Sequence, residues 1–148
     1  MDNDKDISTL NSLIKTTLDS VKGYEDAAEA SEGRFTTPFR ELGRDRQQVV
    51  AHLQEEVRRL GGEPENDGSV MGAAHRAFLN LKQSVTSSDE KAIVDEVERG
   101  EDHLKEKYEE VLRDRDLSPQ ARSVVEQACA SVREGHDRAS ALKHSMAI

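Results

Sequence analysis

Residues 37–64 read TPFRELGRDRQQVVAHLQEEVRRLGGEP, and this stretch contains the start, the body and the end of one long helix. Thr37 followed by Pro38 is typical of a helix start, because threonine can cap free backbone amides and proline suits the first turn. After Leu60 the chain continues Gly-Gly-Glu-Pro, which ends a helix. Between these points an apolar side chain recurs every three or four positions. The stretch therefore predicts an amphipathic helix over residues 38–60.

Apolar residues also recur every three or four positions before and after this helix in the sequence. This spacing predicts further long helices at 6–32, 88–114 and 118–144. A shorter amphipathic segment predicts a fifth helix at 69–85. Because the two-residue alternation of a β-strand is not found between these segments, the fold class is predicted to be all-α.

Composition agrees with helices packed on helices. Of the 148 residues, 34% are hydrophobic and 34% are charged, and the aromatic residues are 3 Phe and 2 Tyr with no Trp. A core of aliphatic side chains suits a bundle, where each helix buries one narrow stripe. The length fits one domain, so residues 1–148 are predicted to form a single four-helix bundle.

The connections between the long helices predict their topology. Short loops join the first two and the last two, so each pair should form an antiparallel hairpin. The connection from residue 62 to residue 87 is too long for a tight turn and can carry the chain along the bundle. The two middle helices would then run parallel, as in a ferritin-like bundle, with a short helix inside the crossover. The alternative is an up-down-up-down bundle with a fifth helix appended.

Charge and hydropathy exclude several classes of partner. The net charge is −9 and basic residues are interspersed with acidic ones, so nucleic acid is not expected as a partner. No apolar run approaches the roughly 20 residues of a membrane span, and the acidic N-terminus is unlike a signal peptide. A cytoplasmic protein without membrane contact is therefore expected. The single cysteine, Cys129, lies among alanines and valines and is expected to be a buried, inert thiol.

Several segments occur in a characteristic order: EVRRLGGEPE at 56–65, GSV at 68–70, AHR at 74–76 and ERGED at 98–102. Together they resemble an uncharacterised bacterial family of small ferritin-like four-helix-bundle proteins, classed as a domain of unknown function. The similarity extends over about residues 7–142. This resemblance implies a ferritin-like fold and a bacterial, cytoplasmic setting, and it implies no mechanism.

Polar side chains on the inward faces are the candidate functional residues. Ferritin-like di-iron sites use a Glu from each of two helices and a Glu-x-x-His motif from each of the other two. Carboxylate and imidazole groups also suit manganese and zinc. The periodicity places four candidate metal ligands on or beside the apolar stripes: Glu25, Glu98, Glu101 and His136.

This ligand set is incomplete for a di-iron site. No glutamate precedes His136 or His52 by three residues, so the motif is absent from the fourth and second helices. The competing interpretation is a hydrogen-bonded polar layer of Glu25, Glu101 and His136, with Arg46 neutralising a carboxylate. Buried charges are tolerated when they are paired, and such pairs can fix helix register.

The leading functional hypothesis is a non-enzymatic bacterial bundle with a structural or interaction role, linked to stress or to housekeeping independent of the cell envelope. No catalytic residue is predicted, because the sequence contains neither a recognisable nucleophile motif nor a phosphate-binding loop. The alternative is a metal-binding protein that holds iron, manganese or zinc at a degenerate carboxylate and histidine site. An oxidoreductase is the weakest hypothesis, since it needs a metal with an open coordination position.

A homo-oligomer is expected, with a dimer favoured. It would form through an outer face of the bundle or through the 69–85 helix. Small residues on that helix allow close packing, and two larger apolar residues would anchor it: Gly72, Ala73, Ala74, Ala77, Met71 and Phe78.

Overall fold

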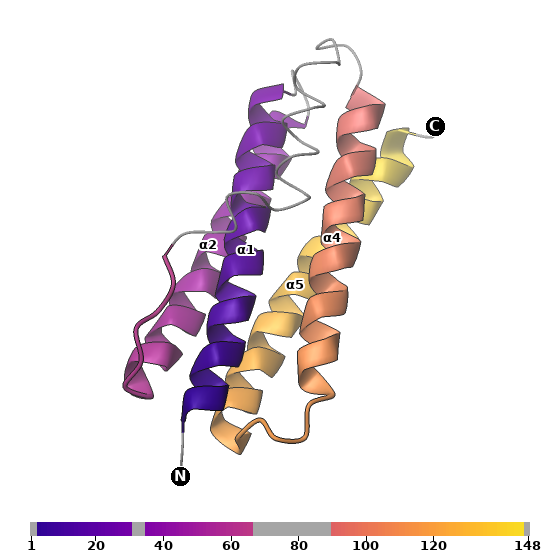
Figure 1. Ribbon diagram of the computed structural model, residues 1–148. Helices are drawn as coiled ribbons and strands as arrows, with labels where there is room; N and C mark the ends of the chain where they lie inside the picture. Colours follow the sequence, from indigo (N-terminus) through magenta and orange to yellow (C-terminus); the bar gives the residue numbers. More distant parts are fainter. Residues whose placement is uncertain (1–2, 31–34, 67–89, 147–148) are drawn as a thin grey trace.

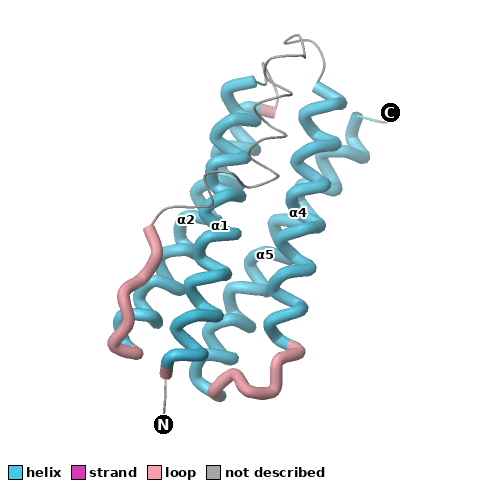
Figure 2. The backbone as a smooth tube through the Cα atoms, viewed as in Figure 1, coloured by secondary structure: helices cyan, strands magenta, loops and turns pink. Residues whose placement is uncertain are grey.

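The computed structural model describes residues 3–30, 35–66 and 90–146, and within these ranges every regular element is a helix (Figure 1, Figure 2). The helices are α1 (Asp4–Ala30), α2 (Thr36–Arg59), α4 (Glu90–Leu112) and α5 (Pro119–Met146). The all-α prediction is confirmed, and the four helices match the four predicted long segments to within a few residues. The predicted short helix at 69–85 lies outside the described residues, as do the small residues expected to form an oligomer contact.

The ends of α2 show which local signals determine the helix. The helix begins at Thr36, one residue before the predicted cap, with Phe35 at the N-cap and without a side-chain capping bond. Phe35 is 1% exposed and stacks on Phe39 with ring centroids 5.9 Å apart, so packing fixes this start. At the other end Gly61 has φ +87°, and the amides of Gly61 and Gly62 donate to carbonyls in the last turn at 3.0 Å. This is the predicted left-handed glycine stop.

The start of α5 follows its sequence signal. Ser118 precedes Pro119, and the Ser118 hydroxyl accepts a hydrogen bond of 3.2 Å from the amide of Ala121. The Ser118 amide donates to the buried Asp6 carboxylate of α1 at 3.2 Å. The cap therefore also ties the second hairpin to the first.

The helices form two antiparallel hairpins, α1 with α2 and α4 with α5, which lie side by side (Figure 1). Helix α1 lies against α4, and α2 lies against α5. Both α2 and α4 end beside the start of α1: Asn3 donates to the Leu60 carbonyl at 3.3 Å, and Lys5 contacts Asp116 at 2.9 Å. The two middle helices therefore run in the same direction, as the long connection predicts and an up-down-up-down bundle would not allow.

The core consists of two apolar clusters stacked along the bundle. The first cluster lies toward the start of α1, and its larger members are Leu10, Leu13, Ile14, Val49, Leu53, Val57, Leu104, Tyr108, Val125 and Val132. The second lies toward the end of α1 and consists of Tyr24, Ala27, Ala28, Phe35, Phe39, Leu42, Ile93, Val94, Val97 and Ala139. Full burial of one large aliphatic side chain contributes about 1.5–3 kcal/mol, so these clusters supply most of the stabilisation.

None of the described helices combines the length and the apolar composition that a bilayer-crossing segment needs.

Candidate functional site: a buried ion pair between two cores

A polar layer separates the two apolar clusters. We use this name for Ser20 of α1, Arg46 of α2 and Glu101 of α4, together with the space above Gly135 of α5. Along each helix these positions fall between a residue of the first cluster and a residue of the second. One position on each of the four helices therefore lies at this level of the bundle.

Arg46 and Glu101 form the centre of this layer. Their side chains are 1% and 2% exposed. Arg46 Nη1 donates to Glu101 Oε1 at 2.6 Å, and Nη2 donates to Oε2, so the pair is bidentate. This planar fork geometry is the strongest form of the arginine–carboxylate interaction. Because α2 belongs to one hairpin and α4 to the other, the pair joins the two hairpins across the interior.

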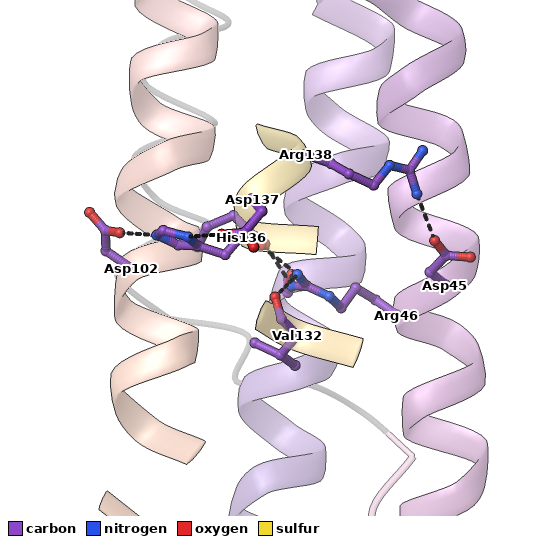
Figure 3. Close-up of polar contacts among 9 residues, drawn as sticks. Asp45, Arg46, Asp102, Val132, His136, Asp137 and Arg138 are labelled. Carbon is purple, nitrogen blue, oxygen red and sulfur yellow. Dashed lines mark hydrogen bonds and ion pairs between the residues drawn. The ribbon is translucent and has the colours of Figure 1, made fainter. Parts of the chain in front are cut away.

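The remaining surface of the guanidinium is also occupied. Nη1 donates to Ser20 Oγ at 2.9 Å, and Nη2 points to the Val132 carbonyl at 3.4 Å (Figure 3). The guanidinium carbon lies 5.7 Å from the centre of the Tyr24 ring, a cation–π distance. A Cβ at Gly135 would overlap Arg46 Nη2, so the missing side chain is what makes room for the cation.

The pKa values in the layer follow from burial and pairing. Burial alone would lower the pKa of Arg46, but the charge and hydrogen bonds of Glu101 outweigh this and raise it. Burial raises the pKa of Tyr24 well above its ordinary value, and the negative charge of Glu101 adds to the effect. Burial likewise raises the pKa of Tyr108, whose hydroxyl lies 2.7 Å from that of Thr17. Both phenols therefore stay neutral at physiological pH.

His136 does not join this layer. Its Nε2 lies 2.6 Å from Asp102 Oδ1, and its Nδ1 lies 3.6 Å from Asp137 Oδ1. The side chain is 18% exposed and bridges α5 to α4 on the flank of the second hairpin, whereas Arg46 reaches the backbone of Val132 (Figure 3). The ring is thus bonded to Asp102 through Nε2, whereas Nδ1 has no hydrogen-bond partner among the described residues.

The other two candidate ligands lie outside the layer as well. Glu25 is exposed, which contradicts the expected inward position. Its neighbour Tyr24 takes that position, and consecutive helical residues are turned about 100° apart. Glu98 accepts a hydrogen bond of 2.8 Å from Lys143 Nζ. Among the residues that the structure describes, no three His, Cys, Asp or Glu side chains are grouped to hold one metal ion.

Of the predicted polar layer, the structure therefore brings together Arg46 and Glu101 and leaves Glu25 and His136 apart. The contributions of Ser20 and Gly135 were not predicted. A signal for Gly135 was present, because this glycine interrupts the apolar stripe of its helix. The large Arg46 side chain on α2 fits the space left by the missing side chain of Gly135 on α5. This fit becomes visible only once the structure shows that the two residues lie at the same height in the bundle.

Cys129 is a free cysteine, 1% exposed and packed within the first cluster. Burial raises the pKa of its thiol, which keeps the sulfur protonated. The predicted buried position is confirmed.

The polar layer is suited to holding helices in register. Both carboxylate oxygens of Glu101 are engaged by Arg46, and the nearby phenols keep their protons. Each charge is matched, which is the condition under which charges are tolerated inside a protein. The layer thus fixes the relative height of α2 and α4.

Comparison with known proteins gives one family match, over residues 5–114. These residues include all of α2 and α4 and all but the first residue of α1, and with them both partners of the buried ion pair. No curated protein matches the chain. Since the match covers most of its length, the chain belongs to the family described as a domain of unknown function, DUF2383.

Proposed function

We propose that this chain is a non-enzymatic helical bundle of ferritin-like topology that acts through its outer surface, in a structural or interaction role. One observation carries the proposal: the guanidinium of Arg46 occupies the interior position beside Glu101 where a metal-binding bundle would hold its cation. The interior is used to join the hairpins.

The energetics of the pair support this reading. A metal ion at Glu101 would have to displace a bidentate arginine and leave that arginine buried without its partner. Loss of one partner from a buried ion pair costs about 3–5 kcal/mol. His136 and Glu98, which could complete a site, are held by Asp102 and Lys143 instead.

Elemental analysis tests the proposal. The protein would be purified from cells grown with added iron, manganese and zinc, and then desalted. We expect metal far below one ion per chain, both in the unaltered protein and in Glu101→Gln. Glu110→Gln, an exposed position on the same helix, is the matched control.

Stoichiometric metal that survives desalting, persists in Glu110→Gln and is lost in Glu101→Gln or His136→Ala would overturn the proposal. That result would support the metal-binding alternative at Glu25, Glu98, Glu101 and His136.

The proposed setting is the bacterial cytoplasm, with a link to stress. The bacterial and cytoplasmic part of this proposal rests on the sequence resemblance described above. A homo-oligomer, with a dimer favoured, is the proposed form, because association gives a small bundle an extended surface.

A further inference from the structure

The segment that follows α2, residues 60–66, is held against one face of α1. It turns back along the first hairpin at the end of α2 (Figure 2). Four side chains of α1 contact it, at positions spaced four residues apart: Asn3, Ile7, Asn11 and Lys15. Residues at this spacing lie on the same side of a helix, so the four contacts follow a line of about 18 Å along α1.

Gly62 allows the segment to approach α1 closely. A Cβ built on Gly62 would lie between 2.8 and 3.0 Å from three atoms of the Ile7 side chain. Ile7 is partly buried and packs against the first cluster, which limits the room for a larger residue. The second glycine of the pair therefore has a different role from Gly61, whose positive φ ends the helix.

Asn11 binds the backbone of the segment on both sides of Pro64. Its Oδ1 accepts a hydrogen bond of 2.9 Å from the Glu65 amide, and its Nδ2 donates to the Glu63 carbonyl at 3.0 Å. A primary amide carries an acceptor beside its donors, so this one side chain satisfies two backbone groups. Pro64 has no amide hydrogen that would need a partner. Asn11 therefore pairs with this backbone as a neighbouring strand would in a sheet.

A second amide side chain binds the same segment from α2. Gln54 Nε2 donates to the Glu65 carbonyl at 2.8 Å, so the Glu65 backbone is bonded by α1 through its amide and by α2 through its carbonyl. The Lys15 ammonium lies 3.7 Å from the Glu65 carboxylate, but both groups are exposed and this ion pair adds little. The two amides thus recognise backbone atoms between α1 and α2.

The direction of the segment matches the route that the chain must take. Both α2 and α4 end beside the start of α1, so α4 begins at the opposite end of the bundle. The contacts advance from Asn3 to Lys15 along α1 as the chain advances from Leu60 to Glu65. The segment therefore leaves the first hairpin in the direction of the start of α4.

We propose that residues 60–66 form a latch, closed by the Asn11 amide, that fixes where the crossover leaves the first hairpin. The site lies between α1 and α2, and its ligand is peptide backbone, supplied by the chain's own residues 63–65. Apart from Ile7, its contacts are polar side chains near the surface, so the latch can open while the bundle stays folded. The latch gives a structural role to the sequence GGEPE at 61–65, and it does not depend on the proposed function.

Amide hydrogen exchange followed by NMR on the full-length protein tests the latch. The Glu65 amide lies outside the helices, and Asn11 is its acceptor. The informative variant is Asn11→Ala, which removes both bonds to the segment. Gln48→Ala, which removes an exposed amide side chain from α2, is the matched control. The Gly62 amide is an internal reference, because its bond to the Val57 carbonyl belongs to the end of α2.

We expect slow exchange at Glu65 in the unaltered protein and in Gln48→Ala. Asn11→Ala should speed exchange at Glu65 about tenfold or more, because the bonds to the segment are lost, and should leave the Gly62 amide and the amides of α2 unchanged. Fast exchange at Glu65 in the unaltered protein would contradict the proposal. An equal effect of the two substitutions, or equally faster exchange throughout α1 and α2, would do the same.

Gly62→Ala tests the latch from its other end and keeps both amide side chains in place. The added methyl group should lift the segment from Ile7 and speed exchange at Glu65, and Ile7→Ala in the same chain should recover part of the protection by making room. Unchanged exchange at Glu65 in Gly62→Ala would show that the two ends do not act as one latch. Circular dichroism confirms that each variant is folded. None of these outcomes depends on metal content or on association, so they are distinguishable from a failure of the proposed function.

Discussion

Arg46 is the residue on which the interior depends. It is a large cation in the position of an apolar core residue, and its donors are engaged by Glu101, Ser20 and the Val132 carbonyl. Desolvation makes an isolated charge in such a place strongly unfavourable, so the pair is tolerated only as a complete set of contacts. The packing around it should therefore be sensitive to small changes.

Gly135 provides the sharpest test at this scale. An alanine there places its Cβ against Arg46 Nη2, so the guanidinium must shift from the position in which it bonds Glu101. We expect Gly135→Ala to lower the free energy of unfolding by about 1–3 kcal/mol, as for overpacking elsewhere. Urea denaturation monitored by circular dichroism measures this change.

Gly100 on α4 is the matched control. Nothing lies within 4 Å of a Cβ built at this position. Replacing a helical glycine with alanine generally stabilises by about 0.5–1 kcal/mol, so Gly100→Ala should raise the free energy of unfolding. Equal stabilisation by both substitutions would show that Gly135 is not required by Arg46.

At the scale of the element, the end of α4 is fastened to the start of α1 by charge. Asp114 accepts a hydrogen bond from the backbone amide of Asp116, and it also contacts Lys5 at 3.3 Å. The amide first, and Lys5 second, lower the pKa of Asp114 below 3.8. A carboxylate with a lowered pKa stabilises the fold above its unfolded pKa, and this contribution disappears as the pH falls through the folded pKa.

Lys5→Met should therefore raise the pKa of Asp114 part of the way toward 3.8, since the amide of Asp116 remains as a donor. Carboxyl carbon chemical shifts followed by NMR between about pH 2 and pH 6 measure this, a range that spans ordinary carboxyl pKa values. Lys107→Met, which removes a positive charge from α4, is the control. An unchanged pKa in Lys5→Met would mean that this ion pair does not form in solution.

The helices were largely predictable from sequence because their signals are local. The Gly61 stop and the Ser118 cap depend only on atoms a few residues away in the chain, and they lie at the predicted end of one helix and the predicted start of another. The start of α2 was misplaced by two residues, because the contact that fixes it, Phe35 on Phe39, depends on burial by the rest of the fold.

The site was predicted less completely, for a different reason. The inward positions of Arg46 and Glu101 follow from helical period, but which inward residues meet depends on the heights of separate helices. Glu25 illustrates the limit, since it adjoins the buried Tyr24 and a rotation of one residue moves it to the surface. Its assignment to the interior was wrong because the apolar spacing alone does not show where the buried face of the helix ends.

At the scale of the whole molecule, the buried pair connects two hairpins that also meet through apolar side chains, the buried Thr17–Tyr108 hydrogen bond, the Ser118 contact with Asp6 and a few surface contacts. Such side chains pack in several registers with similar energies, whereas a bidentate pair is satisfied in only one. The central claim is that Arg46 and Glu101 hold the two hairpins in register.

A double-mutant cycle of unfolding free energies tests this claim most directly, with Arg46→Met, Glu101→Met and the double variant. Each single change leaves one buried charge without its partner and should cost about 3–5 kcal/mol, whereas the double variant should come within about 1–2 kcal/mol of the unaltered protein, because an apolar pair replaces the charges. Single changes that each cost less than about 1 kcal/mol, or a double variant as unstable as the sum of the two, would contradict the claim that these residues act as one buried pair.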